Sequence, residues 1–148
     1  MQADQFTVET DPSPVELEFL EEQINQHNIR ATGFEDYQPL AIFVHDSENR
    51  VIAGISGYTW GGCCEIVFLW VHPDYRQMGY GRKLLQTAET EAIKRTCHLV
   101  VLNSYSFQAP NFYQKLGYTI NGIDEACPLG HRRYHLQKRL DDGQEPYV

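Results

Sequence analysis

The sequence has no long hydrophobic run and no excess of positive charge. No apolar stretch approaches the roughly 20 residues that a membrane span needs, and the polar start Met1-Gln2-Ala3-Asp4 does not resemble a signal peptide. The 12 lysines and arginines are outnumbered by 20 aspartates and glutamates, so the formal net charge is −8. Because nucleic acids call for a basic face, we predict no nucleic-acid partner and no membrane contact, and we expect a cytoplasmic protein.

Paired cysteines and metal-ligand spacings are also lacking. The chain has four cysteines, Cys63, Cys64, Cys97 and Cys127. None of them has C-x-x-C spacing, so in a chain without a signal peptide we expect reduced thiols that mostly pack. His131 and His135 are four residues apart, but the residues around them are typical of a strand rather than of a zinc-binding helix. We therefore predict no metal ion.

The length of 148 residues suits one sheet with its covering helices. We expect a single domain over residues 1–140, followed by a flexible polar tail over residues 141–148. The acidic balance would attract cationic substrates such as polyamines, aminoglycosides or lysine side chains, although acidity also serves solubility alone.

Apolar periodicity predicts both strands and helices. Strands are expected over residues 5–9, 40–44, 51–60, 63–71, 98–102, 118–123 and 131–140. Helices are expected over residues 14–28, 81–95 and 109–116. Gly61-Gly62 forms a hairpin turn in an antiparallel meander. The strand, glycine loop, helix and strand over residues 63–102 form a right-handed βαβ unit with a parallel pair.

The first helix carries a start signal and an apolar stripe. Ser13 can cap it, Pro14 suits the first helical position, and Glu16 completes a capping box. The stripe, at i, i+3 and i+7, consists of Leu17, Leu20 and Ile24. We expect this stripe to pack in the core.

The stretch from Leu69 to Arg82 combines the end of a buried strand, a turn, and two glycines that open a helix. Such an arrangement presents free backbone N–H groups and the positive end of a helix dipole, which favour an anion, most often phosphate. Gly79 and Gly81 leave no side chain where a pyrophosphate would approach the backbone. Glycines before a helix also serve ordinary turns. The spacing of the residues around these glycines is therefore stronger evidence for a phosphate-binding loop than the glycines alone.

Two signatures together resemble the GNAT N-acetyltransferase superfamily. Val71-x-Pro73-x-x-Arg76-x-x-Gly79-x-Gly81 looks like its acyl-CoA pyrophosphate loop. Ala109-x-x-Phe112-Tyr113-x-Lys115-x-Gly117-Tyr118 looks like its second signature, in the expected order. The resemblance implies the GNAT fold of the α/β (α+β) class: a mixed, twisted sheet of six to seven strands flanked by helices, in which a splayed parallel pair holds acyl-CoA.

The resemblance also implies where acetyl-CoA binds as co-substrate. Pantetheine would insert between the two splayed strands, and a backbone N–H near Trp70 would bind the thioester oxygen. Loop amides would bind the pyrophosphate, and basic side chains would add charge. The implied contacts are Leu69, Trp70, Val71, Arg76, Gln77, Met78, Gly79, Tyr80, Gly81, Arg82, Lys83, Asn103, Ser106 and Asn111. Many relatives carry an asparagine where this chain has Ser106, so here a hydroxyl would have to make that contact.

Three residues are candidates for catalysis. Tyr113 matches the tyrosine that protonates the leaving thiolate in many members, and the alternative is that it only packs on its short helix. Cys64-Glu65-Ile66-Val67-Phe68 resembles the strand of the histone acetyltransferase branch, whose glutamate is the base, so Glu65 is a candidate base or acceptor ligand, or a solvated strand residue. His131 follows Pro128-x-Gly130 in a loop that borders the acceptor cleft in this fold, where it could relay a proton or make a structural hydrogen bond.

We therefore expect an acetyl-CoA-dependent N-acetyltransferase, in which the primary amine of a small molecule attacks the thioester directly in a ternary complex. Residues 34–37 offer carboxylates and an aromatic ring that would suit an amine, or they form a solvated loop. The alternatives are a non-catalytic acyl-CoA sensor, which need not retain Tyr113, and an acetyltransferase for protein lysines or N-termini. A dinucleotide-binding module is disfavoured because G-x-G-x-x-G is absent. A homodimer is common in such folds, and the acceptor itself is not encoded in any motif.

Overall fold

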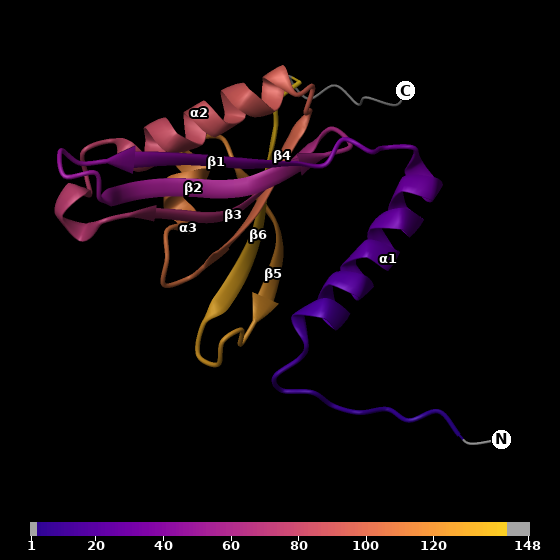
Figure 1. Cartoon of the computed structure of the whole chain (residues 1–148). Helices are drawn as coiled ribbons and strands as arrows, with labels where there is room; N and C mark the ends of the chain where they lie inside the picture. The colour runs from indigo at the N-terminus through magenta and orange to yellow at the C-terminus, as the bar shows by residue number, and fades with distance from the viewer. Residues whose placement is uncertain (1–2, 142–148) are drawn as a thin grey trace. The chain divides into compact units, whose positions relative to one another are not determined.

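The computed structural model describes residues 3–141 (Figure 1). Contacts within the chain divide it into two compact units, residues 1–35 and residues 36–148, which are described separately. The predicted tail over residues 141–148 falls, apart from Asp141, outside the described residues. The prediction of one domain over residues 1–140 stays a prediction.

The first unit consists of an irregular segment and the helix α1 (Pro14–Thr32). The predicted start at Pro14 is confirmed, but the Ser13 side chain makes no capping hydrogen bond; its carbonyl accepts from the N–H of Leu17 at 3.0 Å. The predicted capping box is therefore wrong. The helix ends at Thr32 rather than near residue 28, because Gly33 adopts a left-handed conformation (φ 79°) and donates its N–H to the carbonyl of Ile29.

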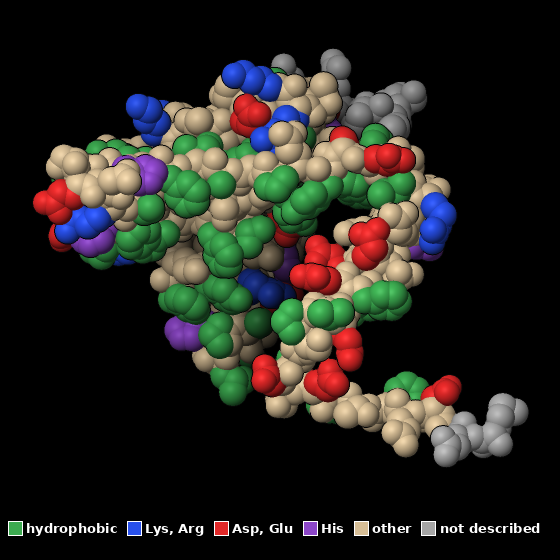
Figure 2. Space-filling view, in the orientation of Figure 1, with side chains coloured by type: hydrophobic (Ala, Val, Ile, Leu, Met, Phe, Trp, Pro, Cys, Tyr) green, Lys and Arg blue, Asp and Glu red, His purple; other side chains and the backbone are tan. Residues whose placement is uncertain are grey.

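Two further predictions for this unit are wrong. Described residues 3–9 form no strand, and Phe6 and Val8 are exposed. A strand needs a neighbour for its N–H and C=O groups, and the described part of this unit offers none. Within its own unit the apolar stripe of α1 forms no core, since no residue of α1 is buried. A single helix has no second layer of its own to pack against. Figure 2 shows many acidic side chains along α1.

The second unit is a six-stranded mixed sheet with the order β1-β2-β3-β4-β6-β5 (Figure 1). The strands are β1 (Gln38–His45), β2 (Val51–Trp60), β3 (Cys63–Val71), β4 (Leu99–Tyr105), β5 (Thr119–Glu125) and β6 (Arg132–Arg139). The predicted antiparallel meander of β1, β2 and β3 is confirmed, and so is the parallel pairing of β3 with β4. The predicted mixed α+β sheet is thus confirmed with six strands.

The helices α2 (Tyr80–Lys94) and α3 (Pro110–Lys115) pack on one face of the sheet, and the short 3₁₀ turn η1 (Pro73–Tyr75) precedes α2. The buried side of α2 carries Leu84, Leu85, Ala88 and Ala92, which join the core cluster together with Tyr113 of α3. Within this unit, the opposite face of β1–β3 is apolar and is not covered by a helix; its side chains include Phe43, Phe68 and Trp70 (Figure 2).

Arg95 fastens the end of α2 to the sheet. Its Nε donates to Glu91, one helical turn earlier, at 3.1 Å. Its terminal nitrogen Nη1 donates to the carbonyls of Gln38 and Pro39 at 3.2 and 3.0 Å, and to the Thr59 hydroxyl at 3.1 Å. One guanidinium thereby orients α2 against β1 and β2.

The parallel strands β3 and β4 separate part-way along their length. Their pairing runs from Cys63–Leu99 to Ile66–Leu102 and then stops, although β3 continues to Val71 and β4 to Tyr105. A register shift in the β2–β3 pairing occurs at the same level, with Gly57 opposite Ile66 and Ser56 opposite Phe68. The extra residue, Val67, bends β3 away from β4 where the pairing ends.

Several remaining features follow the sequence closely. β2 and β3 have the predicted bounds, whereas β4 continues three residues beyond the predicted end at residue 102. The four cysteines are free thiols, as predicted. Of the helices within residues 3–141, none is both long and apolar enough to span a membrane.

Replacing Gly57 with alanine should be strongly destabilising. A Cβ at this position would lie 1.9 Å from the Glu65 carbonyl oxygen, so the β2–β3 backbone would have to shift. We expect Gly57→Ala to lower the free energy of unfolding by about 3 kcal/mol or more, measured by urea denaturation. Gly54→Ala is the control, because the near contact of its Cβ would be with the half-exposed ring of Phe43, which can rotate away, while the Ile42 carbonyl oxygen would lie at an ordinary contact distance of 3.4 Å. Equal stability of the two variants would contradict this explanation of the bulge.

Candidate active site

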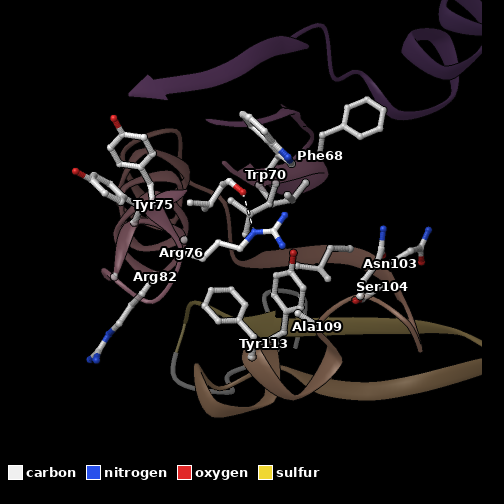
Figure 3. A pocket seen from close by; sticks show the side chains of 18 of the residues that line it. Phe68, Trp70, Tyr75, Arg76, Arg82, Asn103, Ser104, Ala109 and Tyr113 are labelled. Carbon is white, nitrogen blue, oxygen red and sulfur yellow. Dashed lines mark hydrogen bonds between the residues drawn. The ribbon is translucent and has the colours of Figure 1, made fainter. Parts of the chain in front are cut away.

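A cavity of about 900 Å³ opens where β3 and β4 separate (Figure 3). Its walls come from the second half of β3, the glycine loop, the first turn of α2, the end of β4, and residues 107–113. Among the predicted coenzyme contacts, those that line it are Leu69, Trp70, Val71, Arg76, Gln77, Gly79, Tyr80, Gly81, Arg82 and Asn103. Those outside its lining are Met78, Lys83, Ser106 and Asn111. The structure thus brings most of the predicted site together.

The glycine loop leaves backbone donors at the start of α2. Gly79 precedes the helix in a left-handed conformation (φ 84°), and no side chain caps the N-terminus. The N–H groups of the first helical turn therefore lack partners within the helix, and the helix dipole adds positive potential there. A Cβ on Gly81 would lie 3.4 Å from the Phe112 ring, so this glycine also allows α2 to approach α3 closely.

The cavity is cationic although the chain is acidic. Its described lining contains two arginines, Arg76 and Arg82, and no carboxylate. The Nε of Arg76 donates to the carbonyl of Val71 at 3.0 Å, and Figure 3 shows this side chain extending into the cavity, whereas Arg82 points away from its centre. The site can therefore hold an anionic ligand such as a diphosphate.

Ser104 is a functional candidate that the sequence analysis missed. Its side chain is 1% exposed and lines the cavity, and its hydroxyl is the single buried side-chain polar atom without a hydrogen-bond partner within residues 3–141. A buried hydroxyl without a partner is costly, so it suits a polar ligand group. Ser106, the predicted contact, instead accepts a hydrogen bond from the N–H of Arg132 at 3.1 Å. The alternation of side chains along a strand could have indicated Ser104, because it lies on the same buried face of β4 as Val100 and Leu102.

Tyr113 lies in α3 with its hydroxyl directed into the cavity (Figure 3). Its ring packs edge-on against Phe112 and Tyr118, with centroids 5.1 and 5.9 Å apart. Burial raises the pKa of Tyr113 to about 12. The hydroxyl is therefore fully protonated near neutral pH and can serve as a proton donor.

Glu65 belongs to an acidic and aromatic cluster on the sheet face that α2 does not cover. The Tyr58 hydroxyl donates to the Glu65 carboxylate, and this hydrogen bond, with burial, raises the pKa of Tyr58 to about 12. The Tyr37 ring packs 5.4 Å from that of Tyr58. The N–H of Gly61 donates to Asp36 at 2.9 Å, which fastens the segment carrying Tyr37 to the β2–β3 turn. Such a cluster can bind a cation.

His131 is not brought together with Tyr113. It is exposed, packs edge-on against Phe107 at 5.0 Å between centroids, and lines a smaller cavity of about 460 Å³ with Ser106 and Glu125. Within residues 3–141, no group of three or more His, Cys, Asp or Glu side chains could hold a metal ion. The predicted absence of a metal stays a prediction.

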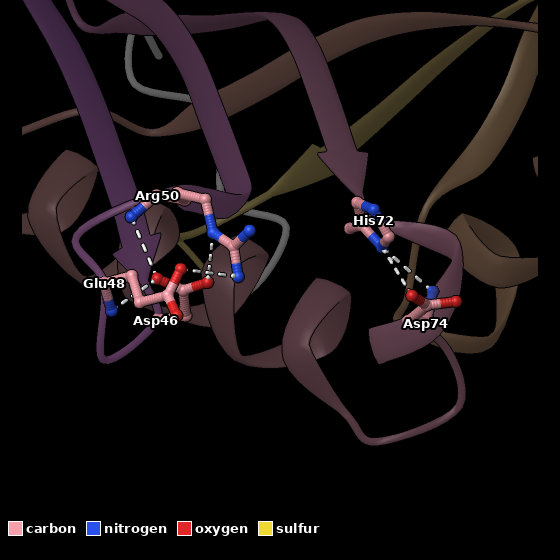
Figure 4. A network of polar contacts seen from close by, with 5 residues as sticks. All are labelled: Asp46, Glu48, Arg50, His72 and Asp74. Atoms are coloured by element: carbon pink, nitrogen blue, oxygen red, sulfur yellow. Dashed lines mark hydrogen bonds and ion pairs between the residues drawn. The ribbon is translucent and has the colours of Figure 1, made fainter.

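His72, just before the glycine loop, has a structural contact. Its Nδ1 accepts from the N–H of Asp74 at 3.0 Å and thereby caps η1 (Figure 4). The hairpin between β1 and β2, in the same view, is closed by Arg50, whose backbone and side-chain hydrogen bonds to Asp46 lower the pKa of that carboxyl. Neither His72 nor this hairpin is among the residues that line the cavity.

Comparison with known proteins agrees with this geometry. A profile of the acetyltransferase (GNAT) family matches residues 5–118. The chain belongs to the GNAT acetyltransferase family. It is therefore an acyltransferase enzyme, and the predicted GNAT fold is confirmed.

Two curated proteins and one solved structure illustrate the similarity of this GNAT acetyltransferase. It is 30% identical over 114 residues to acetyltransferase Atu2258 of Agrobacterium fabrum (strain C58 / ATCC 33970), covering 77% of this chain and 83% of the relative. It is 27% identical over 116 residues to blasticidin-S acetyltransferase of Streptomyces morookaense, covering 76% and 85%. The crystal structure of an acetyltransferase from Bacillus cereus ATCC 14579 superposes with a TM-score of 0.78 at 31% identity, covering 90% and 98%.

Replacing Ser104 with alanine should separate ligand binding from stability. The variant loses a buried hydroxyl that has no partner in the described chain, so its unfolding temperature without ligand should not fall. Its affinity for coenzyme A should fall about fivefold, since one hydrogen bond contributes about 1 kcal/mol. Isothermal titration calorimetry measures this. Ser56→Ala on β2, outside the cavity lining, is the matched control. Unchanged affinity in Ser104→Ala would remove Ser104 from the site.

Proposed function

We propose that this GNAT acetyltransferase transfers an acetyl group from acetyl-CoA to the primary amine of a small molecule. The proposal rests foremost on the cavity between β3 and β4, which has cationic side chains, free amides at the start of α2 and a protonated Tyr113. We further propose direct attack of the amine on the thioester in a ternary complex. A cytoplasmic location and a homodimer remain predictions.

The donor would bind along the separated strands. Amides from Gln77 to Arg82 and the Arg76 guanidinium suit the pyrophosphate. Pantetheine amides suit the backbone groups of β3 that lack β4 as a partner, and the Ser104 hydroxyl suits one of its polar atoms. A backbone N–H near Trp70 would bind the thioester oxygen as negative charge develops on it.

Tyr113 would protonate the departing thiolate. Its raised pKa keeps the phenol protonated until the thiolate, a stronger base than water, forms beside it. Because a thiol has a pKa of about 8.5, the transfer depends on close placement rather than on a favourable pKa difference.

The Glu65 cluster would bind the acceptor amine. Its carboxylate and the rings of Tyr37 and Tyr58 suit an ammonium group. Of the two roles considered for Glu65, base or acceptor ligand, the contact with Tyr58 favours the ligand, since one carboxylate oxygen is already engaged. The blasticidin-S acetyltransferase relative, named for a small molecule, supports a small acceptor.

The decisive experiment is thiol release from acetyl-CoA against separate amines: blasticidin S, polyamines, aminoglycosides, amino acids and lysine peptides. Strong release with one small-molecule class supports the proposal and names the acceptor class. Release with lysine peptides alone would favour a protein acetyltransferase. Tight coenzyme binding without release on any amine would favour the sensor alternative.

Tyr113→Phe should lower turnover with little effect on coenzyme affinity. The phenylalanine keeps the ring packing against Phe112 and Tyr118 but has no proton to donate. We expect kcat to fall about 100-fold, measured by thiol release at saturating acetyl-CoA. Tyr118→Phe is not a neutral control, because its hydroxyl donates to Glu89; Ser56→Ala, which lies outside the cavity lining, is used instead. Unaltered kcat would exclude Tyr113 from the chemistry.

Glu65→Gln should weaken binding of the acceptor. The amide keeps the shape but has no negative charge to attract the ammonium, so KM for the amine should rise about tenfold. The KM for acetyl-CoA should stay constant. Tyr58→Phe, which keeps the carboxylate charge, should have a smaller effect. A constant KM together with a lost acid limb of the pH–rate profile would make Glu65 the base.

A further inference from the structure

A histidine outside the predicted site lies beside the separation of β3 and β4. His135 of β6 is the register partner of Asn103 of β4, and Asn103 follows directly on the last β3–β4 pair, Ile66–Leu102. His135 alternates with buried Leu136, so it lies on the face away from α2. Cross-strand partners have Cβ atoms about 4.5–5.5 Å apart. The imidazole is thus the direct cross-strand neighbour of the Asn103 side chain, and Asn103 lines the cavity.

The neighbouring strand is shaped to accommodate the imidazole. The β5–β6 pairing has a register shift between Ile120 and Gly122, which places Gly122 opposite His135. A Cβ on Gly122 would lie 3.2 Å from the imidazole Cδ2. The bulge and the missing side chain therefore leave space for the ring to lie against β5.

Asp124 of β5 fixes the orientation of this ring. His135 Nε2 lies 2.8 Å from Asp124 Oδ2, and Arg133 donates to the same oxygen, at 2.8 Å from Nε and 2.7 Å from its terminal nitrogen. Hydrogen bonds from Arg133 and then His135 lower the pKa of Asp124, so the carboxylate is ionised near neutral pH. An ionised carboxylate only accepts hydrogen bonds. In the neutral imidazole, Nε2 must therefore carry the proton.

The same argument makes Nδ1 the proton acceptor. No hydrogen bond to Nδ1 is formed within residues 3–141. The imidazole is partly exposed, with 38% of its side-chain surface accessible. A histidine held by a carboxylate through one nitrogen, with the other nitrogen free and accessible, has the arrangement of a general base.

We propose that His135 Nδ1 accepts the proton of the acceptor amine, and that Asp124 is the positioning residue that sets its tautomer. This assignment rests on the proposed acetyl transfer. Glu65 on β3 and His135 on β6 lie on the same sheet face, on opposite sides of β4. Glu65 would attract the cationic acceptor to this face, and His135 would remove the proton of the attacking nitrogen.

The proton balance closes with Tyr113. The ammonium gives one proton to Nδ1, and the amine lone pair then forms the C–N bond while the C–S bond breaks. The sulfur takes the hydroxyl proton of Tyr113, and the second proton of the nitrogen returns to the Tyr113 oxygen through water. The products are the amide, coenzyme A with its thiol, and an imidazolium that loses its proton to solvent.

The kinetic test compares His135→Gln, Asp124→Asn and the control His45→Gln on the amine with the highest turnover. His135→Gln should lower kcat about 100-fold, leave the KM for acetyl-CoA unchanged, and remove the acid limb of the pH–rate profile. Asp124→Asn should lower kcat at least tenfold. The charged or titratable groups around His135 are Asp124 on β5, Arg133 on β6 and Tyr105 on β4. Circular dichroism and coenzyme affinity confirm that each variant is folded.

Nuclear magnetic resonance tests the assignment without turnover. Long-range ¹⁵N–¹H spectra of the wild type should show a proton on Nε2 and a lone pair on Nδ1, and Asp124→Asn should shift this tautomer balance. A proton on Nδ1 in the wild type would overturn the inference. So would a retained kcat and acid limb in His135→Gln, or loss of that limb in Glu65→Gln alone. If no amine is acetylated, the proposed function fails, while the tautomer still decides whether Nδ1 can accept a proton.

Discussion

The hydrogen bonding between β3 and β4 ends at Ile66–Leu102, and the rest of the site depends on that limit. The bulge at Val67 turns β3 away from β4, and it can form because Gly57 has no side chain to meet the Glu65 carbonyl. Beyond this level, the backbone N–H and C=O groups of β3 that would face β4 form no hydrogen bonds with it, because the two strands have diverged. Buried backbone groups need partners, so the gap favours an extended, amide-containing ligand. The same divergence opens the cavity between the start of α2 and α3.

The charges on the two sides of β4 would keep the substrates of the proposed reaction apart. The cavity between β3 and β4 contains Arg76 and Arg82 without any carboxylate among its described lining residues, which suits an anionic coenzyme. On the sheet face away from α2, Glu65 and Asp124 are the acids nearest β4 in register. An acidic chain with a net charge of −8 thus keeps one cationic cavity for its donor, while its general acidity favours a cationic acceptor.

Sequence patterns predicted those parts whose signals are local. The bounds of β2 and β3, the buried side of α2 and the glycine loop follow from periodicity and from glycines in neighbouring positions. The failures concern long-range pairing. Residues 5–9 alternate like a strand, but alternation does not supply a neighbouring strand. His135 was passed over for His131 because its partner Asp124 is set by the β5–β6 register and its bulge, which one sequence does not reveal.

Two consecutive residues of β4 connect the two halves of the proposed chemistry. Successive side chains of a strand point to opposite faces, so Ser104 enters the core on the side of Tyr113, while Asn103 lies beside His135 on the other side. Burial keeps the proton on Tyr113, as its proposed role as donor requires. An ionised Asp124 holds Nε2–H, which leaves Nδ1 of His135 for its proposed role as acceptor. In the proposed reaction, a proton taken up on one face would thus be matched by one released on the other, on either side of a single strand.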